Sequence, residues 1–134
     1  LAAPPRVNIV AHPWWWSGGW ADPAGNYPAE PWFDDFNVIP QSMHDEFAAA
    51  AVEGDKAVEI NLEAILLTPH YPRRFIAQYL DYLARLKERG VRFSIGSDCH
   101  APHYQVDFAA AEAMLASVGI TDSDLWRLPP EGAS

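Results

Sequence analysis

Cysteine and basic residues are scarce in this sequence. Cys99 is the one cysteine, so no disulfide can form within these 134 residues, and we expect a reducing compartment, the cytoplasm. Nine Lys and Arg stand against 18 Asp and Glu, which gives a net charge of −9. Because a nucleic-acid binder needs a basic surface patch, we expect no nucleic-acid partner.

Long apolar runs are absent as well. No run approaches the ~18 residues of a membrane span, so we expect no membrane partner. The first ten residues lack the charged and apolar regions of a signal peptide. With 49% apolar residues, the chain can build the core of one domain, 1–134. Because it begins with Leu1 and not Met, we expect it to be a segment of a longer protein.

Strand-like and helix-like patterns alternate along the chain. Helices are predicted at 40–54, 71–90 and 105–119, with a further turn at 121–126; each of the first three follows a predicted strand, at 6–10, 56–62 and 91–98 respectively. Such alternation favours right-handed crossovers between parallel strands. The fold class predicted is therefore α/β.

A long irregular segment, residues 13–39, separates the first strand from the first helix. It holds five of the six tryptophans, and we call it the Trp-rich loop. Loops of this length in compact domains are often functional. We expect its aromatic side chains to pack on the body of the protein, with one or two lining a cleft. Binding of a partner protein is the alternative.

Polar residues stand where each predicted strand ends. His12 follows the first strand, Glu59 and Asn61 close the second, and Asp98 and His100 follow the third. Because carboxyl ends of parallel strands share one edge of a sheet, we expect these side chains to approach one another there. Imidazole and carboxylate groups bind Zn, Mn and Fe. The sequence thus indicates a metal site at that edge.

Each of these residues also has a purely structural interpretation. Asp98 would cap the next helix, with His100 on the surface, and His12 would be a satisfied loop residue. Glu59 either needs a buried partner within its apolar strand or faces outward, and Asn61 would orient a water or a substrate oxygen. The proline after His12 predicts extended backbone at that histidine.

Other candidate residues are weaker. Arg73 and Arg74 open the second helix, where they would form an anion site for substrate or a solvated first turn. His103 is close enough in sequence to the Asp-x-His pair to line the same site. His44 is predicted on a helix surface, and Cys99 is interpreted as a small packing residue.

The segments "VNIVAHP", "AVEIN" and "FSIGSDCHAP", in this order and spacing, resemble the second half of the polymerase-and-histidinol-phosphatase (PHP) family. The stretch "HYPRRFIAQYLDYLARLKERGVRFSIGSDCHAP" is similar to histidinol-phosphatase-like members, and the likeness covers about 7–130. The resemblance implies part of a distorted (β/α)7 TIM-like barrel with up to three divalent metals. It also implies hydrolysis of a small phosphorylated substrate by a metal-bound hydroxide.

Carried over by position, three residues match metal ligands of the family. His12 matches the histidine of the family's His-Pro motif, and Asp98 and His100 match its Asp-x-His motif. All three are therefore the candidate catalytic residues. Glu59 and Asn61 match a rim motif without an assigned ligand. The family's opening His-x-His motif is absent from this sequence. A missing amino-terminal half or another chain would have to complete the site, so we expect this segment alone to be inactive.

Two other functions fit the same residues. An amidohydrolase-type enzyme also ends a barrel strand with a metal-binding aspartate, but it would act on amides or esters. A non-enzymatic interaction module would instead use the Trp-rich loop to bind a partner.

Overall fold

The computed structural model describes residues 7–14, 34–100, 102 and 105–128. Strands and helices alternate along the described chain, as predicted. In order, the elements are β1 (Ile9–Val10), the 3-10 helix η1 (Phe36–Val38), α1 (Gln41–Glu53), β2 (Ala57–Asn61), the π-helical turn η2 (Leu62–Leu66), α2 (Arg73–Glu88), β3 (Arg92–Gly96), α3 (Phe108–Ser117) and the 3-10 helix η3 (Asp122–Asp124).

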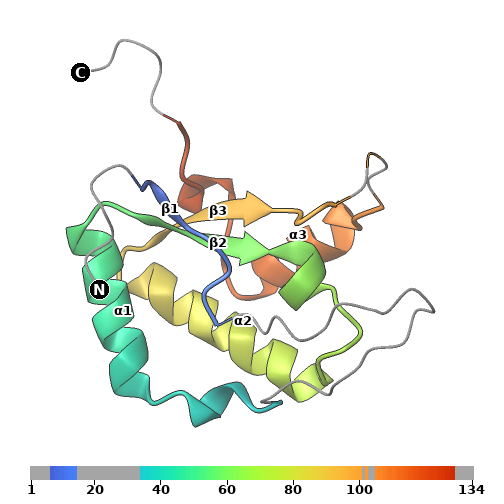
Figure 1. Cartoon of the computed structure of the whole chain (residues 1–134), viewed down its shortest axis with the longest axis horizontal. Coiled ribbons are helices and arrows are strands. Elements are labelled where there is room, and N and C mark those ends of the chain that lie inside the picture. The colour runs from blue at the N-terminus through green and yellow to red at the C-terminus, as the bar shows by residue number, and fades with distance from the viewer. Residues whose placement is uncertain (1–6, 15–33, 101, 103–104, 129–134) are drawn as a thin grey trace.

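The three strands form one open parallel sheet in the order β1-β2-β3. Figure 1 shows β2 and β3 pointing the same way, so their carboxyl ends share an edge. Ile60 pairs with Ile95, and Asn61 pairs with Gly96. Because successive side chains alternate between faces, Ile60 and Glu59 lie on opposite faces of the sheet. The predicted α/β class with parallel strands is confirmed.

Helices α1 and α2 lie against one face of this sheet (Figure 1). Strand residues Val58, Ile60 and Phe93 are completely buried in a core shared with α2. The buried residues of α2 recur at helical spacing, at Phe75, Tyr79, Tyr82, Leu83 and Leu86. Burying each such side chain contributes about 1.5–3 kcal/mol, so this stripe fixes α2 to the sheet.

The chain after α3 returns to the free edge of β3. Leu125 forms a parallel bridge with Phe93, and the backbone nitrogen of Trp126 donates to the carbonyl oxygen of Phe93 at 2.6 Å. A capping box between Thr121 and Asp124 begins η3 just before this contact. A fourth segment therefore runs parallel to the three strands.

Element boundaries differ from the predicted ones. In the described part of the first predicted strand, only Ile9–Val10 has strand pairing. The third strand stops at Gly96, where its partner β2 ends at Asn61, and Asp98 beyond it adopts a left-handed backbone with φ 56°. The prediction that His44 lies on a helix surface is wrong, since only 8% of this residue is exposed.

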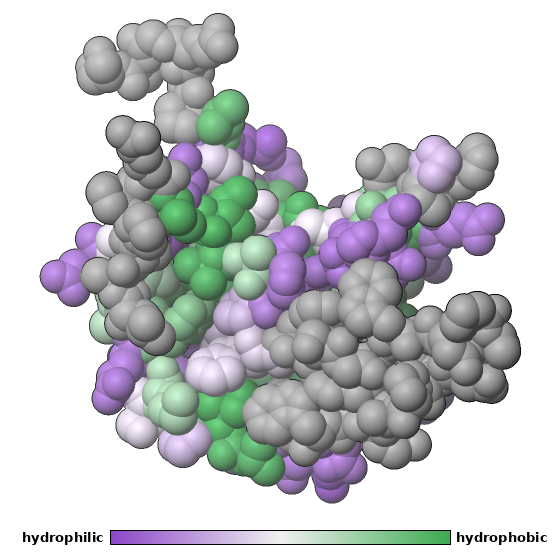
Figure 2. All heavy atoms as spheres, viewed as in Figure 1, coloured by the Kyte–Doolittle hydropathy of each residue, from purple (hydrophilic) through white to green (hydrophobic). Residues whose placement is uncertain are grey.

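Two of the exposed large apolar residues, Ile95 and Phe108, line the same pocket. Figure 2 shows the hydrophobic residues of one face in separate patches between hydrophilic ones. None of the helices in the described residues combines the length and hydropathy needed to cross a membrane. Residues 15–33, most of the Trp-rich loop, lie outside the described residues.

Candidate functional site

The carboxylate of Glu59 binds His12 at the edge of the sheet. Its Oε2 atom accepts from the backbone nitrogen of His12 at 2.6 Å and lies 3.0 Å from Nδ1 of the same residue. The Glu59 side chain is only 15% exposed, against 38% for His12. Of the two roles left open for Glu59, the structure shows the one in which the carboxylate has a partner. That partner is a predicted metal ligand.

Gly96 gives the Glu59 side chain its space. A Cβ atom at Gly96 would overlap Oε1 of Glu59 and would lie 2.8 Å from Cδ and 3.1 Å from Cγ. The register places Gly96 opposite Asn61, two residues beyond Glu59, so the carboxylate extends along the strand toward the carboxyl edge. The glycine of the "SIGSD" segment therefore permits the contact with His12.

Asp98 and His100 form a second pair beyond the end of β3. Nε2 of His100 lies 3.4 Å from Oδ1 of Asp98. Asp98 is the less accessible partner, with its side chain 25% exposed against 63% for His100. The left-handed backbone at Asp98 turns the chain at this point, a conformation that Asp tolerates better than most residues.

The turn after β1 has an unusual backbone. His12 has φ 26° and Trp14 has φ 70°. The extended conformation predicted for His12 from the following proline is therefore wrong. Positive φ at a non-glycine residue costs about 1–3 kcal/mol and persists only where surrounding contacts fix it. For His12, its backbone hydrogen bond to Glu59 and the contact of its Nδ1 atom with the same carboxylate are such contacts.

Each pair contains a side chain that could bind a divalent cation. Histidines that bind metals usually donate a hydrogen bond from the second ring nitrogen to a carboxylate. The contact between Nδ1 of His12 and Glu59 is compatible with this arrangement. Because Zn–N and Zn–O bonds are about 2.0–2.1 Å long, two ligand atoms on one tetrahedral zinc ion lie about 3.3 Å apart. The distance between Nε2 of His100 and Oδ1 of Asp98 is close to this value. Within residues 7–14, 34–100, 102 and 105–128, no three His, Cys, Asp or Glu side chains form a metal-binding group.

Asn61 has a structural role at the same edge. It is completely buried, and its Oδ1 atom accepts from the backbone nitrogen of Ala64 at 2.8 Å, which caps η2. Its Nδ2 atom has no hydrogen-bond partner among the residues that the structure describes. The Oδ1 atom of Asn61 is thus engaged by the backbone, so the contact of Asn61 with a water or a substrate oxygen stays a prediction.

The predicted arginine anion site lies at the start of α2. Arg74 is 3.7 Å from Asp34 and 3.9 Å from Asp35, with 59% of its side chain exposed. Arg73 is exposed as well. These carboxylates compete with any anion at Arg74. His103 lies outside the described residues.

Trp14 belongs to a group of aromatic residues behind the His12 turn. Its packing against the core confirms the expectation for this tryptophan of the Trp-rich loop, although its partners were not predicted. Trp14 donates from Nε1 to the hydroxyl of Tyr82 at 3.3 Å, and its ring meets those of His44 and Phe47 edge to face. His44 also stacks on Phe36. The burial of His44 had one sequence signal, because His44, Ala48 and Ala51 share one stripe of α1.

Burial changes the acidity of this aromatic group. It lowers the pKa of His44, and the positive charge of Arg85 lowers it further while Asp45 opposes the change. Burial raises the pKa of the Tyr82 hydroxyl, which the hydrogen bond from Trp14 partly offsets. The histidine is therefore favoured in its neutral form and the phenol keeps its proton.

Comparison with known proteins gave no match. No family model matches the chain, and neither a curated protein nor a solved structure matches it.

Proposed function

We propose that this chain carries part of the active site of a PHP-type metal-dependent phosphoesterase. The observation that supports this most is the hold of Glu59 on His12 at the carboxyl edge of a parallel sheet. In metal sites, a histidine that binds the ion through one ring nitrogen usually forms a hydrogen bond to a carboxylate through the other. Substrates would be small phosphate esters.

His12, Asp98 and His100 are the proposed ligands of divalent Zn, Mn or Fe. With Nδ1 of His12 directed to Glu59, Nε2 is the nitrogen that would bind an ion. Asp98 and His100 would bind through Oδ1 and Nε2. When bound, such ions activate water and neutralise the charge of a phosphoryl group.

The remaining ligands would come from elsewhere. We propose that an amino-terminal half or another chain adds them, and that the open sheet then forms part of a distorted (β/α)7 barrel. The face of the sheet that carries Glu59, Ser94 and Gly96 lies opposite the α1–α2 layer and would line its interior. Three ligands spread over up to three ions hold each ion weakly, so the 134 residues by themselves should not turn over substrate.

Hydrolysis assays on the full-length protein that contains these 134 residues test the proposal. Phosphomonoesters, amides and carboxylate esters are compared with Mn²⁺, Zn²⁺ or Fe²⁺ added and after chelation. We expect metal-dependent phosphomonoester hydrolysis that falls roughly 100-fold or more in Asp98→Asn and His100→Asn. His70→Asn, which changes an exposed histidine before α2, is the matched control.

Two results would overturn the proposal that the protein is a phosphoesterase. One is full hydrolysis in Asp98→Asn, His100→Asn and the chelated protein. The other is hydrolysis of amides or carboxylate esters but not of phosphomonoesters, which would favour the amidohydrolase alternative.

A further inference from the structure

Trp14 connects the His12 turn to the helical layer. Its Nε1 atom donates to Tyr82 of α2 at 3.3 Å. Its ring centroid lies 5.6 Å from that of His44 and 6.3 Å from that of Phe47, both edge to face and both from α1. One side chain from the turn thus contacts the two helices that cover the sheet.

The backbone between His12 and Trp14 needs such an anchor. Both residues have positive φ, a conformation that a bulky residue such as Trp adopts only when other contacts enforce it. Glu59 holds the turn at His12, and the aromatic contacts hold it at Trp14. Because only three residues separate the end of β1 at Val10 from Trp14, displacement of the Trp14 ring would change the position of His12.

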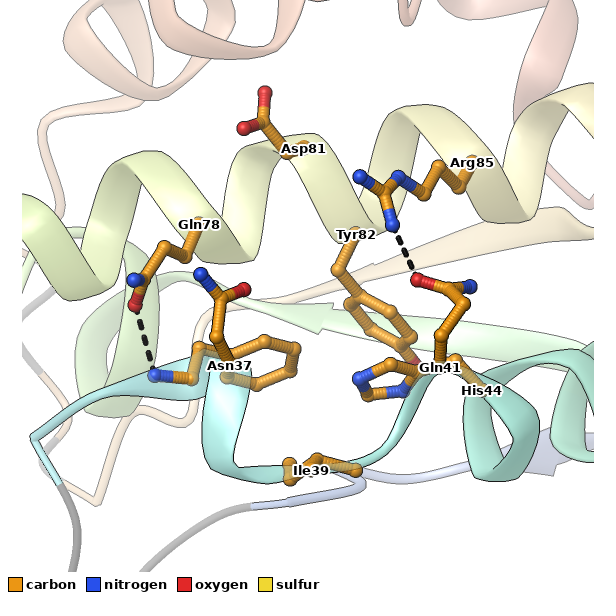
Figure 3. Close-up of a pocket in the computed structure, with 9 residues that line it drawn as sticks. Asn37, Ile39, Gln41, His44, Gln78, Asp81, Tyr82 and Arg85 are labelled. Carbon is orange, nitrogen blue, oxygen red and sulfur yellow. Dashed lines mark hydrogen bonds between the residues drawn. The ribbon is translucent and has the colours of Figure 1, made fainter.

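On the helical side of this anchor, Tyr82 is buried among aromatic rings. His44 and Tyr82 have ring centroids 4.7 Å apart and line a pocket of about 210 Å³ between α1 and α2 (Figure 3). Only 4% of Tyr82 is exposed, and Phe36 stacks on His44 with its ring planes 4° apart. The acceptor for Trp14 is therefore fixed by the core and not by solvent.

We infer that Trp14 is a positioning residue, which uses the hydroxyl of Tyr82 to hold His12 in the orientation that meets Glu59. The effect of Trp14 on the His12–Glu59 contact stands by itself, whereas its consequence for metal binding rests on the proposed function. The inference also accounts for the indole at this position, because phenylalanine would keep the ring contacts but lose the donor.

The test uses conservative variants that keep the aromatic rings. Trp14→Phe removes the donor, and Tyr82→Phe removes its acceptor. Tyr79→Phe is the matched control, because Tyr79 lies on the same helix and its buried hydroxyl has no hydrogen-bond partner among the described residues. Trp126→Phe controls for the loss of an indole at a distant position, next to β3.

The first readout is the tautomer of His12, measured by nitrogen NMR of the imidazole rings and assigned with His12→Asn. In the unmodified protein we expect the proton on Nδ1, facing Glu59. In Trp14→Phe and Tyr82→Phe the signal should move toward the tautomer mixture of a solvated histidine. The two changes combined should have no more effect than either alone, because they remove the same hydrogen bond.

The second readout is Mn²⁺ affinity, which should fall roughly two- to tenfold in both variants, as loss of one hydrogen bond implies. An unchanged His12 tautomer in Trp14→Phe and Tyr82→Phe would overturn the inference, and so would an equal change in Tyr79→Phe. A changed tautomer with no Mn²⁺ binding in any variant would uphold the positioning role and count against the metal site alone.

Discussion

The carboxylate of Glu59 contacts both the backbone nitrogen and the imidazole ring of His12. The Oε2 atom lies 2.6 Å from the backbone nitrogen and 3.0 Å from Nδ1. These contacts join the end of β1 to β2 at the edge where Asp98 and His100 follow β3. The contact therefore fixes the backbone of a strained turn and the orientation of a proposed metal ligand together.

Removal of the Glu59 carboxylate should cost both stability and metal affinity. Glu59→Ala leaves the amide of His12 without its acceptor, and we expect urea unfolding to show a loss of about 1–3 kcal/mol. Glu59→Gln keeps an acceptor oxygen and should cost less. If Glu59 orients a ligand, either change should weaken Mn²⁺ binding about 10- to 100-fold. Glu63→Ala, an exposed neighbour, should stay within about 0.5 kcal/mol of the unmodified protein.

Gly96→Ala should act through Glu59. The added methyl group would lie 2.8 Å from Cδ of Glu59, so the carboxylate must move away from His12. Overpacking of this kind costs about 1–3 kcal/mol. In a Glu59→Ala background the space is empty, and the cost of Gly96→Ala should shrink by about 1 kcal/mol or more. Equal costs in both backgrounds, measured by urea unfolding, would contradict the contact.

His44 should make stability depend on pH. Its folded pKa lies below the ordinary value of 6.5, so the unfolded chain binds a proton at a pH where the folded one does not. Its contribution is complete above pH 6.5 and is lost as the pH falls, until the folded histidine is protonated too. Urea midpoints between about pH 7.5 and about pH 5.5 should therefore fall less in His44→Phe than in the unmodified protein.

His70→Gln is the control for that titration, because His70 is exposed. The slope of stability against pH should be unchanged in this variant. A His44→Phe protein whose stability falls as steeply as that of the unmodified protein would show that His44 is not the group responsible.

The helix α2 and the parallel direction of the strands could be predicted, because both follow from patterns along the sequence. Phe75, Tyr79 and Leu83 recur with the helical period, and alternating strands and helices imply parallel pairing. The buried position of His44 could not be predicted as readily, because its partners Phe36 and Tyr82 come from η1 and α2. Its partners meet it only once the chain has folded.

The same limit applies to the candidate site. The sequence identified the strand ends and the residues His12 and Glu59, but the contact between them depends on how β1 meets β2 and on the space at Gly96. Local preference even predicted the wrong backbone at His12, where the proline that follows favours extended structure. Tertiary contacts from Glu59 outweigh that preference.

The central claim is that His12 and His100 bind a divalent cation at the carboxyl edge of the sheet. Titration of the chain with Mn²⁺, followed through the broadening of its histidine ring signals in proton NMR, tests it most directly. We expect the signals of His12 and His100 to broaden first, while those of His44 and His70 stay sharp, and we expect Asp98→Asn to reduce the effect. Uniform broadening of all the histidines, or none at His12 and His100, would contradict the claim.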